Sequence, residues 1–150
     1  MVIYILLQLQ VLEKQLLASN SLRQFGQPTL VLAPTVTIRQ QWVDRINTAF
    51  LANPLHAEQL ISQDLKNPKL ITIATYQALH SAMIQLKGES RAEDTDDQAE
   101  IEHFDYQGFD VVATFKEHAL GTLCLDECHH LRNEWWKSLE AFRNSFTSIH

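Results

Sequence analysis

The chain has 150 residues, of which 45% are hydrophobic, and a formal net charge of −6. This length suits one domain with a core of ordinary size, and two cysteines are too few for the disulfide framework of small secreted proteins. The apolar start, residues 1–7, is followed by glutamine, glutamate and lysine well short of the roughly 20 residues that a membrane span needs. We therefore expect a cytoplasmic protein with no membrane partner.

The negative charge is concentrated in one segment. Residues 89–105 hold eight of the 18 acids and one of the 12 bases, which leaves 10 acids and 11 bases in the rest of the chain. The remainder is close to +1, so the overall acidity does not exclude a nucleic-acid partner. Because residues 87–108 are charged and have glycines near both ends, we expect a solvent-exposed insertion there. A regulatory or partner-binding insert is the alternative.

A helix is predicted at the start of the chain. Apolar side chains at Ile5, Leu9, Leu12 and Leu16 recur at steps of four, three and four, which places one apolar stripe on a helix. No capping residue precedes this stripe, so the helix is expected to begin in mid-element. The polar stretch 19–27 predicts a loop.

Two units of a strand followed by a helix come next. The short apolar runs 29–33 and 70–74 are typical of strands buried on both faces, which implies a parallel sheet. A helix is expected after each run, with a threonine as its N-cap. The inward positions are Ile38, Trp42, Ile46 and Phe50 after Thr35 or Thr37, and Tyr76, Leu79, Met83 and Leu86 after Thr75.

The last third of the chain continues the alternation. Residues 110–119 predict a short helix, residues 121–126 the next strand, and Asn133 the cap of a final helix. The inward residues expected on that helix are Trp135, Leu139 and Phe142. Strands that alternate with helices indicate an α/β fold, in which helices flank a parallel sheet.

The residues directly after the last predicted strand carry the clearest chemical signal. They are Asp126, Glu127, Cys128 and His129, and ligands of parallel α/β sheets bind outside the carboxyl ends of the strands. An aspartate there can hold a magnesium ion through water, and the adjacent glutamate can orient and deprotonate an attacking water. Acids at a strand end also cap the next helix in many proteins, so the pair alone leaves both interpretations open.

Two upstream segments make the pattern specific. Leu30–Thr35, followed by Gln41, resembles motif Ia of superfamily 2 helicases, and Ile73–Gln77 resembles the threonine-bearing segment between motifs Ia and II. Asp126–His129 then resembles the DExH form of motif II. The three segments occur in the family's order, and the resemblance implies a partial RecA-like domain over residues 1–150. Within the superfamily, the chain is similar to bacterial proteins that resemble the helicase subunits of type III restriction enzymes.

The resemblance assigns roles to the motif II residues. It implies ATP and Mg²⁺ as cofactors, with Asp126 associated indirectly with the metal and Glu127 acting as the base for hydrolysis. His129 would link the nucleotide site to the second helicase domain or to nucleic acid.

The resemblance also implies a nucleic-acid partner, with DNA favoured, and possible restriction or modification subunits. The implied nucleic-acid contacts are Pro34, Thr35, Gln41 and Thr75. Hydroxyls and N–H groups at helix starts can bind phosphates without reading sequence. Val36 stands where many members carry arginine; Arg39 either compensates or is a solvated surface residue.

The family's phosphate-binding loop, Gly-x-x-x-x-Gly-Lys-Thr, does not occur in this sequence, and neither does motif III. Without the loop a triphosphate loses its main binding surface, so the chain alone is expected to be inactive. We interpret the chain as a fragment of a helicase or translocase, or a truncated reading frame that begins just after the loop. The alternative is a non-catalytic nucleic-acid-binding or adaptor module with a decayed motor site.

A structural zinc site is a further alternative, because Cys124, Cys128, His129 and His130 lie within seven residues. Zinc sites prefer paired ligands separated by a loop, and Cys124 lies on a predicted buried strand, so a core role is favoured. The other histidines show no paired spacing and are expected on the solvent side. They are His56, His80, His103, His118 and His150.

Overall fold

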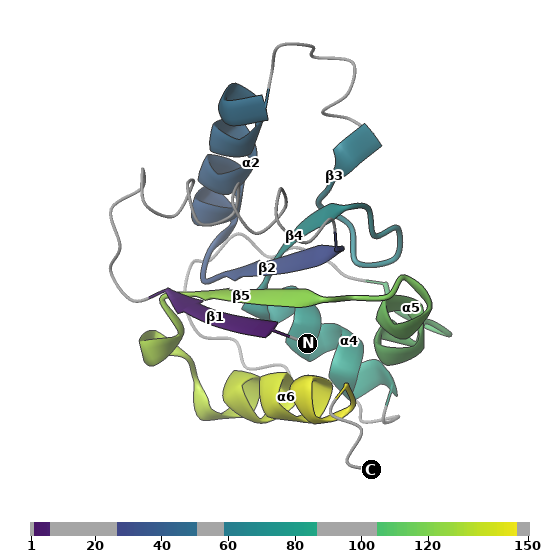
Figure 1. The fold of residues 1–150 in the computed structure, drawn as a ribbon. Helices are drawn as coiled ribbons and strands as arrows, with labels where there is room; N and C mark the ends of the chain where they lie inside the picture. The colour runs from purple at the N-terminus through teal and green to yellow at the C-terminus, as the bar shows by residue number, and fades with distance from the viewer. Residues whose placement is uncertain (1, 7–26, 51–58, 87–104, 147–150) are drawn as a thin grey trace.

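The computed structural model describes residues 2–6, 27–50, 59–86 and 105–146. Its centre is a five-stranded sheet in the order β1-β5-β2-β4-β3, and every neighbouring pair is parallel (Figure 1). The predicted α/β fold with a parallel sheet is confirmed. The strands are β1 (Val2–Leu6), β2 (Thr29–Ala33), β3 (Ile61–Ser62), β4 (Ile71–Thr75) and β5 (Thr122–Asp126). The helices are α2 (Val36–Phe50), α4 (Tyr76–Leu86), α5 (Val111–Glu117) and α6 (Asn133–Asn144), with a 3-10 turn η1 (Cys128–His130).

Helices cover both faces of the sheet, as the continuously apolar strands predicted. Every residue of β2, β4 and β5 is buried. Successive side chains of a strand point to opposite faces, so Leu30 and Leu32 join one core and Val31 and Ala33 the other. Helix α2 packs on the second face, while α4, α5 and α6 contribute to the first (Figure 1).

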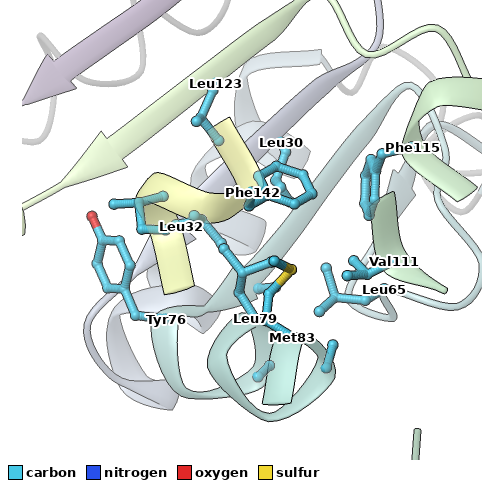
Figure 2. Packing of buried hydrophobic residues seen from close by; sticks show 14 of the residues in the cluster. Leu30, Leu32, Leu65, Tyr76, Leu79, Met83, Val111, Phe115, Leu123 and Phe142 are labelled. Carbon is cyan, nitrogen blue, oxygen red and sulfur yellow. The ribbon is translucent and has the colours of Figure 1, made fainter. Parts of the chain in front are cut away.

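The larger core lies between the sheet and the helices α4, α5 and α6. Phe142 of α6 is 0% exposed, and its ring meets that of Phe115 edge-on, with the two centroids 5.9 Å apart. The ring of Phe146 lies 4.9 Å from Phe142 on another side. Figure 2 shows Phe142 among the leucines of the sheet and the residues Leu79 and Met83 of α4. The inward positions predicted for Leu139 and Phe142 are confirmed, and Trp135 is partly buried against the same core.

Short polar side chains begin three of the helices. The hydroxyls of Thr35 and Thr75 each accept a hydrogen bond from the backbone N–H three residues on, at 3.1 Å, which confirms both as caps of α2 and α4. Asp110 caps α5 in the same way. The predicted cap at Asn133 is wrong, because Asn133 is the first residue of α6 and the N-cap residue, Arg132, makes no side-chain cap bond.

The first element is a strand and not the predicted helix. Val2–Leu6 pairs along its whole length with β5, ending where Leu6 stands opposite Asp126. Ile5 of the predicted stripe therefore belongs to a parallel ladder, in which backbone pairing with β5 overrides the helical spacing of the side chains. The other stripe positions, Leu9, Leu12 and Leu16, lie outside the described residues, as does most of the predicted loop.

The end of the predicted insertion is part of the core. Residues 87–104 lie outside the described part of the chain, but Tyr106 is 5% exposed and its N–H donates to Gln85 Oε1 at 3.0 Å. The prediction of a solvent-exposed segment is therefore wrong at Tyr106. The two-residue strand β3, at the sheet edge beyond β4, was not predicted because a run of two residues carries no periodicity.

Two histidines expected on the solvent side instead join elements together. His80 Nδ1 of α4 lies 2.7 Å from Ser138 Oγ of α6, and His118 Nε2 donates to the carbonyl of Lys69 at 2.7 Å. Both rings are half-buried. The other three lie outside the described residues: His56, His103 and His150.

No helix in the described ranges has the length and apolarity that would let it cross a membrane.

Candidate functional site

Four neighbouring strands of the sheet, β1, β5, β2 and β4, end side by side at one edge. The register places Ala33 opposite Thr75 and Leu6 opposite Asp126, and β5 lies between β1 and β2. Because these strands are parallel, the segments that follow them leave from the same edge, which is at the left in Figure 1. The fold thereby brings together the predicted site residues Pro34, Thr35, Thr75, Asp126 and Glu127.

Asp126 is held from the helix that covers its face of the sheet. The carboxylate is 0% exposed, and its Oδ2 accepts a hydrogen bond from Trp42 Nε1 of α2 at 2.9 Å. A buried carboxylate is costly unless it is hydrogen-bonded, and an indole N–H can only donate. The prediction that Trp42 faces inward is confirmed, but its role as the donor to Asp126 carried no local signal because the two residues are 84 positions apart.

Tyr76 connects the start of α4 to the end of β5 through a hydrogen bond. Its hydroxyl donates to the backbone carbonyl of Asp126 at 2.9 Å in a buried environment. Burial is the main cause that raises the pKa of Tyr76 well above its ordinary value, with Cys128 and Asp126 adding to the effect. The hydroxyl therefore stays protonated, and remains a donor, across the ordinary pH range.

Replacing Tyr76 with phenylalanine is expected to lower the free energy of unfolding by about 1–3 kcal/mol, because it leaves the buried carbonyl of Asp126 without this donor. Urea unfolding followed by circular dichroism measures the change. The slope of the transition should match that of the unchanged chain. A loss below about 0.5 kcal/mol would mean that another group or water replaces the hydroxyl.

Glu127 adopts a strained backbone conformation directly after β5. Its φ of 50° and ψ of 42° lie in the left-handed region, which costs a residue other than glycine about 1–3 kcal/mol. Glu127 stands at the N-cap position of η1, yet its side chain makes no cap hydrogen bond there. The carboxylate of Asp126 in turn binds Trp42. The interpretation that this acidic pair caps the next helix is therefore wrong for Glu127.

The two cysteines behave as core residues. Both are buried and free, which confirms the core role predicted for Cys124. Burial, with Asp126 adding to it, raises the pKa of Cys124 to about 12, and burial also raises the pKa of Cys128. Cys124 packs in the core on the α2 face of the sheet and Cys128 in the core on the other face, so the two thiols belong to different cores. Within the described ranges, no three His, Cys, Asp or Glu side chains come together as metal ligands.

The residues that the resemblance assigns to nucleic acid differ in exposure. Thr35 and Gln41 are exposed on α2, and Pro34 is half-buried just before it. Thr75 is 3% exposed and its hydroxyl caps α4, so the side chain is not presented to a ligand. His129 is exposed on η1.

The structure contradicts one of the two interpretations of Arg39, while the compensating phosphate contact stays a prediction. It is half-buried with its Nε enclosed, which disagrees with a fully solvated surface residue.

A complete Mg²⁺–ATP site does not fit the residues at this edge. Magnesium in nucleotide sites takes one or two carboxylates together with the phosphates, and Asp126 with Glu127 could supply that acidic half. The phosphate-binding half needs a nest of backbone N–H groups and a lysine, and the sequence contains no Gly-Lys-Thr or Gly-Lys-Ser. The residues at this edge therefore fit the acidic part of such a site and not its phosphate-binding part.

The sequence model of one protein family, described as "Type III restriction enzyme, res subunit", matches residues 14–149 of the chain. The match includes β2, α2, β4, α4 and β5, and so every residue of the site described above. No curated protein and no solved structure gives a significant match.

Proposed function

The chain belongs to the family of type III restriction enzyme res subunits, and we propose that it contributes the acidic half of a motor's nucleotide site and part of its nucleic-acid contact. It is a fragment of a superfamily 2 helicase motor domain with a RecA-like fold. The observation that carries the proposal is the shared carboxyl edge of β2, β4 and β5, where the three motif segments meet. On this proposal residues 1–150 form one partial domain, with an insertion between α4 and α5 that begins at about residue 87 and ends before the buried Tyr106.

Asp126 and Glu127 are the proposed motif II acids. Asp126 would stand near the magnesium ion and Glu127 near the attacking water in a motor that also supplies ATP's phosphate-binding loop, and His129 would face the second motor domain or nucleic acid. The strain at Glu127 supports this assignment, since residues held in the left-handed region cluster at active sites. Because the loop is absent, we propose that the isolated chain does not hydrolyse ATP.

The proposed nucleic-acid contact is the start of α2. Thr35 and Gln41 are exposed there beside Pro34, and the first N–H groups of a helix attract phosphates. Thr35 and Thr75 would both contribute through their backbones, because their hydroxyls already cap α2 and α4. Contacts of this kind bind the phosphate backbone of either DNA or RNA. DNA is the proposed partner because the family name is that of restriction enzymes, and restriction or modification subunits are the proposed protein partners.

The missing loop supports a second candidate function. A chain with this nucleic-acid edge and no means of binding triphosphate could act as a non-catalytic binding or adaptor module.

Fluorescence anisotropy with labelled single-stranded DNA, double-stranded DNA and RNA, combined with an assay for phosphate release from ATP, tests the proposal. We expect binding that weakens steeply as salt rises, and no phosphate release with or without nucleic acid. Turnover by the isolated chain would contradict the proposed inactivity. Failure to bind any of the three nucleic acids at low salt would contradict the proposed contact.

Replacing Gln41 with alanine is expected to weaken oligonucleotide binding by roughly threefold to tenfold, the worth of one hydrogen bond. The side chain is exposed, so the stability should stay within about 0.5 kcal/mol of the unchanged chain. The matched control is Gln107→Ala, the same chemical change at an exposed residue beside the last turn of α4, away from the carboxyl edge. Equal losses in the two variants would remove the α2 start from the proposed contact.

A further inference from the structure

We propose that Trp42 is a positioning residue, which fixes the carboxylate of Asp126 relative to α2 and so ties the acidic half of the nucleotide site to the nucleic-acid contact. This inference rests on the proposed function, because it takes the roles of Asp126 and of the α2 start from there. It assigns to Trp42 a role beyond that of a core side chain.

The hydrogen bond between Trp42 and Asp126 is short and buried. Trp42 Nε1 and Asp126 Oδ2 are 2.9 Å apart, the indole is 4% exposed and the carboxylate 0% exposed. Water therefore does not compete for either atom. The charge-assisted bond is of the stronger kind, and it connects two elements that are far apart in the sequence but packed together on one face of the sheet.

Trp42 lies near the start of α2. The helix begins directly after Pro34 and Thr35, and Trp42 follows the exposed Gln41 by one residue. The first turn of the helix and the indole are less than two turns apart, a span over which a helix moves as a rigid rod. A shift of the α2 start on nucleic-acid binding would consequently move the donor of Asp126.

A small hydrophobic core surrounds the bond. Val43 and Ile46 of α2 and Cys124 of β5 belong to the same small core as Trp42. The thiol of Cys124, two residues before Asp126, lies in this core on the same face of the sheet as the indole. From this core, the indole N–H is the donor that orients Asp126 Oδ2.

Neither residue can touch nucleic acid directly, since both are buried. An effect of changing them on nucleic-acid affinity is therefore indirect, and α2 is the element that connects Trp42 to the proposed contact. Energetic coupling between two sites is reciprocal. Changing Asp126 should therefore lower the affinity for nucleic acid, as changing Trp42 does. Changes at two partners in one interaction are not additive. A tryptophan that merely fills the core would not share its effect on binding with Asp126.

The experiment is a double-mutant cycle on the full chain with Trp42→Phe and Asp126→Asn, read by anisotropy with labelled single-stranded DNA well below the unfolding temperature of each variant. Each single change is expected to lower the affinity roughly fivefold, and the double variant should bind no more weakly than the weaker single variant. Trp136→Phe, at a residue 38% exposed on α6, is the control and should bind as the unchanged chain does.

A second measurement needs no variant. In a ¹H–¹⁵N spectrum of the unchanged chain, DNA should shift the indole N–H resonance of Trp42 and leave that of Trp136 in place. Losses that multiply in the double variant, wild-type affinity in Trp42→Phe, or an unmoved Trp42 resonance when DNA is bound would each overturn the inference. If the unchanged chain binds no DNA at all, the proposed nucleic-acid contact fails first and the coupling falls with it.

Discussion

Replacing Phe142 with alanine is expected to lower the free energy of unfolding by about 3–5 kcal/mol, a large share of the stability of a domain of this size. Phe142 is 0% exposed and packs against the rings of Phe115 and Phe146. Its removal leaves a cavity between α6 and the sheet. Figure 2 shows the leucines that surround the ring in the unchanged chain. Chemical denaturation followed by circular dichroism measures the loss.

The control for this change is Trp136→Ala, which also removes a large aromatic side chain from α6. Trp136 is 38% exposed on the outer side of the helix, so its loss should cost about 1 kcal/mol or less. A similar loss in both variants would mean that helix propensity, and not the core beneath α6, dominates the effect of Phe142→Ala.

Restoring a phosphate-binding loop is the second change with a large expected effect. If residues 7–14 are replaced by Gly-x-x-x-x-Gly-Lys-Thr, the chain should change from one without measurable affinity for Mg²⁺–ATP to one with a Kd of about 1 mM or tighter, which corresponds to about 4 kcal/mol of binding free energy. The reason is that β1 ends at Leu6, opposite Asp126. A loop that leaves β1 therefore starts beside the proposed acidic half of the site.

Isothermal titration with Mg²⁺–ATP measures this affinity, and two variants of the grafted chain sharpen the result. Changing the lysine of the graft to alanine should remove binding. Glu127→Gln should retain binding and abolish any turnover, because the base acts on water and not on the phosphates that hold ATP. A grafted chain that folds but does not bind Mg²⁺–ATP would contradict the placement of β1 beside the acidic half.

Most of the fold could be predicted from local patterns. The apolar runs that became β2, β4 and β5 are short and continuous, and strands of that kind require cover on both faces. The threonine caps could also be predicted from a local pattern, because Thr35 and Thr75 accept hydrogen bonds from N–H groups only three residues on. Local spacing failed for β1, because four apolar residues at helical steps do not show that β5 offers a parallel edge.

The sequence by itself also determined which residues gather at the candidate site. The segments around Thr35, Thr75 and Asp126 each follow a predicted strand, and parallel strands place such segments at one edge. These inferences needed nothing beyond neighbours in the chain, since capping and strand burial act over a few residues.

The tertiary structure alone decided how the site is held. Trp42 donates to Asp126 from 84 positions away and Tyr76 from 50, so no local pattern could pair them. The left-handed conformation of Glu127 is likewise imposed by the turn from β5 into η1, against the preference of its own residue type. Contacts between distant segments and backbone strain depend on how the elements pack on the two faces of the sheet, which no local pattern of residues contains.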